Sequence, residues 1–234
     1  MKTIPVLIVL LLAISFSTFS QPERADIIER KIRSLTKTIS NSADTTKKEV
    51  YKFVYSAGGD DSIQYVNGDP AFKFIAQPDD KGRVNQLIRF DIKGNQDEWH
   101  KYTYNRDGSY TIEVIAQGAG TISLARYNKK NWLMEEEIES SYLMIYQRNA
   151  AGKTQKILVK EKGKTTTEEI AAFYFDKKGF VTKGEGTTDG GNVVYFKYND
   201  KGLVSEIKTI FGEKKAKQNT EIILLEYEFY ENQD

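Results

Sequence analysis

The chain has 234 residues, with 34 Lys and Arg against 33 Asp and Glu, one His and no Cys. This charge balance excludes a global basic field that would attract nucleic acid or anionic lipid. The lack of Cys excludes disulfides, thiolate nucleophiles, Cys-ligated metals and the acylated Cys of a bacterial lipoprotein. A single His excludes a metal site built from several imidazoles.

The first 20 residues have the pattern of a secretory signal peptide. Lys2 is the only charge before Glu23, and the apolar run Ile4 to Phe16 precedes small polar residues. That run is shorter than the roughly 20 residues of a membrane span. We expect cleavage near Ser20–Gln21 and an exported protein, periplasmic or at the cell surface, that is not a lipoprotein. An uncleaved N-terminal anchor is the alternative.

Residues 21–48 are expected to form an amphipathic helix and a polar linker. Ile28, Ile32 and Leu35 recur at helical spacing within 22–40, and charged side chains fill the other positions. Residues 41–48, NSADTTKK, are polar and predict the linker.

From residue 49 onward the pattern changes to that of β-strands. Turn sequences such as DDKG (79–82), NRDG (105–108), DKKG (176–179) and NDKG (199–202) recur along residues 49–234. Their spacing of about 9 to 15 residues is typical of short antiparallel strands joined by tight turns. We therefore expect one mainly β domain, a long up-and-down meander of about 15 short strands in an open, twisted or rolled sheet.

The turn sequences also predict a turn type. An Asp or Asn opens a type I turn and accepts hydrogen bonds from backbone N–H groups ahead of it. The Gly three residues later supplies the positive φ of a bulge. Aromatic residues two apart, such as Phe173 and Phe175, lie on one face of a strand and can stack across the sheet.

These residues resemble the YD repeats of RHS-type bacterial proteins, whose signature is Tyr-Asp, two residues, Gly and an apolar residue. The matching stretches are Phe90-Asp91…Gly94, Tyr104-Asn105…Gly108, Phe175-Asp176…Gly179 and Tyr198-Asn199…Gly202. Asn often replaces Asp, Phe often replaces Tyr, and the Arg that commonly follows the Gly in that family is missing. The resemblance implies an exported bacterial β-repeat protein, often at a cell surface.

The sequence contains no recognisable catalytic constellation. His100 follows Trp99 in DEWHKYTY, and no nucleophile elbow or phosphate-binding Gly-rich loop occurs. We expect no catalytic residue, metal, nucleotide or other cofactor. Trp99, His100 and Trp132 are the candidate binding residues, because indole rings can stack on sugars. The alternative is that they pack within or across strands.

Two tripeptides match an O-glycosylation sequon of some exported bacterial proteins. They are DTT (44–46) and DSI (61–63), which place candidate glycans on Thr45 and Ser62.

The function we expect is a non-enzymatic one, in which a sheet surface binds a protein or glycan of the cell envelope. Nucleic acid is not expected as a partner, nor is insertion into a membrane.

Two alternatives stay open. One is an envelope polysaccharide hydrolase with paired carboxylates, for which EEEIE (135–139) is the densest acidic run. The other is an outer-membrane β-barrel, although Lys183, Glu206 and Lys208 interrupt the strands and the chain ends in ENQD. The oligomeric state and the pairing of the last strand, 221–230, also stay open.

Overall fold

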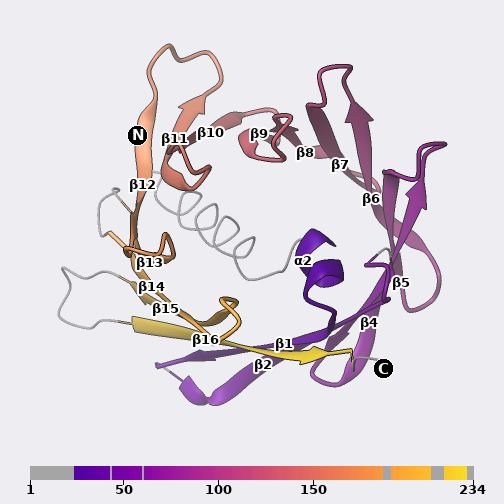
Figure 1. The fold of residues 1–234 in the computed structure, drawn as a ribbon, viewed down its shortest axis with the longest axis horizontal. Helices are drawn as coiled ribbons and strands as arrows, with labels where there is room; N and C mark the ends of the chain where they lie inside the picture. The colour runs from indigo at the N-terminus through magenta and orange to yellow at the C-terminus, as the bar shows by residue number, and fades with distance from the viewer. Residues whose placement is uncertain (1–23, 43, 60, 187–190, 212–218, 231–234) are drawn as a thin grey trace. The chain divides into compact units, whose positions relative to one another are not determined.

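The computed structural model describes residues 24–42, 44–59, 61–186, 191–211 and 219–230. The predicted signal peptide and its cleavage site lie outside these residues. The elements in chain order are α2 (Arg24–Glu29), β1 (Ile32–Asn41), β2 (Asp44–Tyr55), β3 (Asp61–Val66), β4 (Asp69–Pro78), β5 (Val84–Asp91), β6 (Gln96–Tyr104), β7 (Tyr110–Ala116), β8 (Gly120–Tyr127), β9 (Leu133–Ile138), β10 (Tyr142–Arg148), β11 (Thr154–Glu161), β12 (Glu168–Phe175), β13 (Val181–Gly186), β14 (Val193–Tyr198), β15 (Val204–Phe211) and β16 (Asn219–Phe229) (Figure 1).

The strands form a closed antiparallel barrel. Each strand pairs with its neighbours in sequence, and β16 also pairs with β1. The prediction of an open or rolled sheet of about 15 strands is therefore wrong. The last strand, whose pairing the sequence left open, is hydrogen-bonded to β15 on one side and β1 on the other. Closure leaves neither of these strands with an unpaired edge.

The strand that the prediction lacked is β1, which lies in the segment that was expected to be helical. Helix α2 ends at Glu29, and Ile32–Asn41 form β1 instead. This stretch is rich in β-branched residues, which favour strands. Pairing with both β2 and β16 overrides the helical spacing of its apolar residues. The predicted linker is also shorter than expected, because β2 begins at Asp44.

The chain divides into two compact units. Unit 1 comprises Met1–Gly59, Gln64–Asp69 and Ile170–Asp234, and unit 2 comprises Asp60–Ile63 and Pro70–Glu169. Because side chains alternate along a strand, the paired strands of each unit have two faces of different composition.

In unit 1 the two faces contrast strongly. The buried face also holds Lys37 and Glu221, but most of its side chains are apolar. The register brings these side by side: Leu35, Phe53, Phe173, Val194, Phe196, Ile207, Ile223 and Leu225. The opposite, exposed face carries ion pairs between Lys183 and Glu185 and, at 2.9 Å, between Lys197 and Glu206. Burial of the apolar face stabilises the unit by about 25 cal/mol for each Å² removed from water.

Unit 2 has the same division, with more polar groups on its buried face. Met144, Ile157 and Val159 are buried on β10 and β11. On β6, β7 and β8 the same face carries a ladder of neighbouring aromatic rings, most of them stacked: Tyr102, Tyr104, Tyr110 and Tyr127. The exposed face of unit 2 carries Arg126, Glu135 and Lys160, among other charged residues.

The predicted turn chemistry is confirmed. In the turn that begins at Asp176, the carboxylate accepts hydrogen bonds from the N–H groups of Lys178 (2.8 Å) and Phe180 (2.9 Å). The N–H of Gly179 donates to the Asp176 carbonyl, and Gly179 has a φ of 82°. The same backbone pattern recurs at six other turns, which begin at Asp79, Asp91, Asn105, Asn128, Asn149 and Asn199.

Candidate functional site

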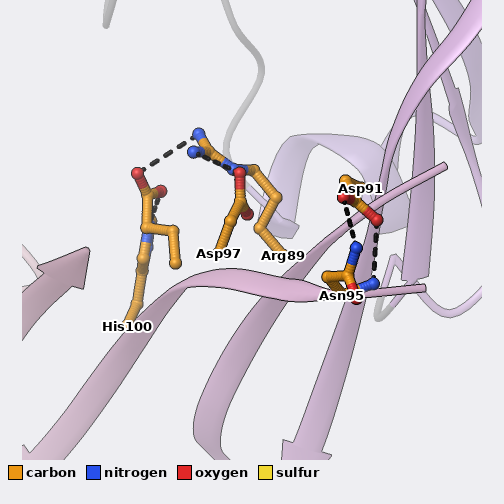
Figure 2. A network of polar contacts seen from close by, with 6 residues as sticks. Arg89, Asp91, Asn95, Asp97 and His100 are labelled. Atoms are coloured by element: carbon orange, nitrogen blue, oxygen red, sulfur yellow. Dashed lines mark hydrogen bonds and ion pairs between the residues drawn. The ribbon is translucent and has the colours of Figure 1, made fainter. Parts of the chain in front are cut away.

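The single histidine belongs to a network of charged groups that joins β5 to β6 (Figure 2). His100 Nε2 lies 2.9 Å from Glu98 Oε1, and Glu98 Oε2 lies 3.2 Å from Arg89 Nη1. Arg89 Nε and Nη2 donate to the two carboxylate oxygens of Asp97 at 2.9 and 3.0 Å. The guanidinium carbon of Arg89 also lies 4.7 Å from the centre of the Phe72 ring.

Hydrogen bonds and ion pairs join the groups of this network to one another. The hydrogen bond to His100, with a further contribution from Arg89, holds the pKa of the Glu98 carboxyl below its usual value. The hydrogen bond from Arg89 to Asp97 raises the pKa of the guanidinium. Every member has a charged partner, and no hydroxyl or thiol nucleophile takes part. The arrangement therefore fixes the register of β5 and β6 and places Arg89 over Phe72.

Trp99 points to the opposite, exposed face of unit 2. There it lies in a cross-strand row with Ile75 of β4, Ile88 of β5 and Ile115 of β7. Ile88 is buried in this row, and the other three side chains are half-buried. We call these four residues the apolar strip. Neighbouring rows on this face are interrupted by charged side chains, as in the row of Gln86, Lys101 and Glu113.

The apolar strip ends in a hollow of about 400 Å³. Ile75 belongs to both, and the other apolar residues that line the hollow are Ile63, Pro70, Phe72, Phe90 and Ile92. Ligand sites usually have a volume of a few hundred Å³ and mostly apolar walls, as this hollow does.

Ile92 differs from the residues at the equivalent position of the other turns of this type. It occupies the second position of the turn that begins at Asp91, and 70% of its surface is exposed. The residues at this position in the six other turns are Asp80, Arg106, Lys129, Ala150, Lys177 and Asp200. No other turn of this set exposes a large apolar side chain here.

Two lysines flank the apolar surface. Lys73 is paired in register with Phe90, and Lys101 lies two residues after Trp99 on the same face of β6. Both are exposed, and neither has an ion pair among the described residues. The surface therefore combines apolar side chains with Lys73 and Lys101 at two of its sides, while Asp91 lines the hollow and Glu113 is paired in register with Lys101.

A second hollow, of about 680 Å³, contains part of the acidic run EEEIE. Glu135 and Glu137 lie on the exposed face of β9, where Arg126 approaches them to 3.7 and 3.6 Å. Glu136 points to the buried face and accepts a hydrogen bond of 3.0 Å from the Tyr146 hydroxyl. Burial raises the pKa of the Glu136 carboxyl, and this hydrogen bond offsets part of the rise. The two carboxylates that share a face are thus held by one guanidinium.

The structure does not bring Trp132 together with Trp99 and His100. Trp132 closes the turn that begins at Asn128, and its ring packs on Gly152. Arg148 supports this contact by donating to the Gly152 carbonyl at 2.7 Å. Trp99 and His100 are neighbours in sequence but point to opposite faces. Of the predicted binding residues, the structure places only Trp99 on the apolar surface.

The two candidate glycosylation sites lie in strands. Thr45 belongs to β2 rather than to a linker, and Ser62 is half-buried in β3. Glycans on these residues stay a prediction. In the described part of the chain, no three His, Asp or Glu side chains gather as a metal site requires. None of the described helices is long and apolar enough to cross a membrane.

Sequence reasoning missed Ile75, Ile92, Lys73 and Lys101. Three of them are ordinary strand residues whose proximity depends on the pairing of β4 with β5 and of β5 with β6. Ile92 could have been found, because aligning the repeated turns shows an isoleucine where the others have charged residues or Ala.

Comparisons with known proteins do not assign the chain to a family. No family model matches it, and no curated protein matches it. A porin-like protein from Bacteroides uniformis is similar at a TM-score of 0.43 and 7% identity, over 84% of this chain and 98% of that chain. A TcdB2-TccC3 structure without its hypervariable C-terminal region reaches 0.32 at 10% identity, over 76% of this chain and 13% of that chain. A LolA superfamily protein from Nitrosomonas europaea reaches 0.26 at 10% identity, over 92% and 93%.

Proposed function

We propose that the protein is an exported β-barrel that works in an aqueous part of the cell envelope and binds a partner protein through the apolar strip and its hollow. The observation that carries this proposal is the hollow where the exposed Ile63 and Ile92 meet the half-buried Ile75, at the end of the row that leads to Trp99 and Ile115. Contiguous apolar patches on a soluble surface mark interaction sites. Trp residues are also enriched among the side chains that dominate binding energy.

The flanking charges indicate the chemistry of the partner. Lys73 and Lys101 would attract carboxylates placed on either side of an apolar segment. We therefore expect a protein segment with apolar side chains that fill the hollow and cover Trp99, flanked by Asp or Glu. Complementary charge of this kind favours rapid and selective association.

Charged side chains argue for an aqueous location. On the exposed face of unit 1, Lys208 and Lys183 flank Tyr195 in one cross-strand row, and Lys197 pairs with Glu206 in the next. A Lys or Arg facing lipid near the bilayer midplane costs roughly 2–4 kcal/mol. Most apolar side chains of the unit lie on its other face and are buried, whereas Tyr174, Tyr195 and Leu224 are exposed among these charges. The outer-membrane alternative expected a barrel, which is observed, but the lysines on the exposed face of this unit oppose contact with lipid.

A crosslinking experiment in the native host tests the proposal. A photoreactive phenylalanine analogue is placed at Ile92 and, as a matched control, at Lys177, which has the same position in another turn. We expect a discrete protein adduct from position 92 only, and its loss when Trp99→Ser is added. Equal adducts at both positions would contradict a partner site, and lipid adducts from position 92 would favour the membrane alternative.

Ile92→Asp should weaken the captured complex by at least about tenfold, because it places a carboxylate in the apolar hollow. It should change the free energy of unfolding by no more than about 0.5 kcal/mol, since the side chain is exposed. Titration of the purified partner and urea unfolding measure the two effects. Lys177→Asp should change neither, and an unchanged affinity for Ile92→Asp would remove Ile92 from the site.

A further inference from the structure

The second hollow of unit 2 is a separate site with different chemistry. It lies on the exposed faces of β8 to β11 and next to the β9–β10 turn. Its floor is Leu143, which is paired in register with Glu137 on one side and Lys160 on the other. Two strand spacings of about 4.8 Å separate the backbones below these walls, which gives a width of about 10 Å.

The two walls carry opposite groups. Glu135, Arg126 and Glu137 form one wall, where a single guanidinium holds two carboxylates. Lys160 and Lys162 form the other, and neither has an ion pair among the residues that the structure describes. Lys164 also lines the hollow but is paired with Glu161. The second wall therefore has two ammonium groups free to bind an anion.

A strained turn forms the rim of this hollow. Glu139 and Ser140 both have left-handed backbone conformations, with φ of 48° and 53°. Two such residues suit the tight turn between β9 and β10, where Asn and Gly are the usual choices. A non-glycine residue in this conformation costs about 1–3 kcal/mol, and such residues cluster at functional sites. The strain places Ser140 and Ser141 beside the hollow.

We propose that this hollow binds a saccharide that bears carboxylate groups. The apolar face of a sugar ring would lie on Leu143, its hydroxyls would donate to Glu135 and Glu137, and its carboxylate would pair with Lys160 and Lys162. An apolar floor with polar walls matches an amphipathic ring better than it matches an aliphatic chain. The site is independent of the apolar strip, so either proposal can fail without the other.

Calorimetric titration of the full mature chain tests the site with two probes, tetragalacturonate and the neutral tetrasaccharide of β-1,4-linked galactose. We expect the acidic probe to bind at least about tenfold more tightly, because two ammonium groups face its carboxylates. Added salt should reduce this preference. Equal binding of the two probes, or binding of neither, would overturn the proposal.

A pair of variants locates the binding. Lys160→Gln/Lys162→Gln should reduce affinity for tetragalacturonate about tenfold and leave that for the neutral probe little changed. The matched control is Lys81→Gln/Lys93→Gln, which removes two exposed lysines from turns outside this hollow. Both pairs of residues are at the surface, so both variants should keep the circular dichroism and melting temperature of the parent. Equal losses from the two pairs would show attraction by net charge rather than a site.

Discussion

Gly152→Ala is expected to lower the free energy of unfolding by about 3 kcal/mol or more. The residue has a φ of 80°, and a left-handed conformation costs a residue with a side chain roughly 1–2 kcal/mol. An added Cβ would also lie 2.3 Å from two ring carbons of Trp132. The indole is held in a turn and cannot withdraw as a flexible side chain could, so overpacking adds roughly 1–3 kcal/mol. Urea unfolding monitored by Trp fluorescence measures the loss.

Gly82→Ala is the matched control for backbone strain alone. Gly82 has the same position in an equivalent turn and a φ of 75°, and no atom would lie within 4 Å of an added Cβ. Its loss should stay at about 1–2 kcal/mol. Adding Trp132→Ala to Gly152→Ala should recover part of the extra loss, as expected for two residues in contact. Equal losses at the two glycines would show that Trp132 does not depend on Gly152.

The turns could be predicted from the sequence because their cause is local. The Asp or Asn, the Gly and the hydrogen bonds that join them lie within five residues, as at Asp176. Closure of the barrel could not be predicted in this way. It depends on contacts such as that of Ser34 Oγ, which donates to the Glu228 carboxylate at 2.6 Å across 194 residues of sequence. The helical spacing of Ile28, Ile32 and Leu35, of which the last two belong to β1, gave no sign of this partner.

The candidate sites show the same division. Trp99 drew attention as a residue type, but the apolar surface around it depends on the register of four strands. His100 was also a candidate binding residue, and in the structure its ring is hydrogen-bonded to Glu98. The acidic run 135–139 was the candidate for the paired carboxylates of a hydrolase. The structure shows β9 paired on both sides, so alternation divides the run between a surface hollow and a buried carboxyl.

That buried carboxyl provides a prediction about pH. Burial raises the pKa of Glu136, so the folded protein resists its ionisation. When folding raises the pKa of a carboxyl, the protonated carboxyl contributes stability that is fully present below the unfolded pKa of about 4.5. This stability is lost as the pH rises through the pKa of the folded protein, because ionisation is then favoured in the unfolded chain. Glu136→Gln keeps an acceptor for the Tyr146 hydroxyl but has no charge to bury. We therefore expect the variant to be more stable than the parent at pH 7.

The advantage of Glu136→Gln should shrink as the pH falls towards 4, where most of the parent carboxyl is protonated in both states. Urea unfolding at several pH values between 4 and 8 measures this difference. Glu135→Gln is the control, because it removes a neighbouring charge that points to the exposed face and pairs with Arg126. That loss of a surface ion pair should cost no more than about 1 kcal/mol at pH 7. If Glu136→Gln instead destabilised the protein at pH 7, its carboxylate would have to be ionised and held by a partner in the folded state.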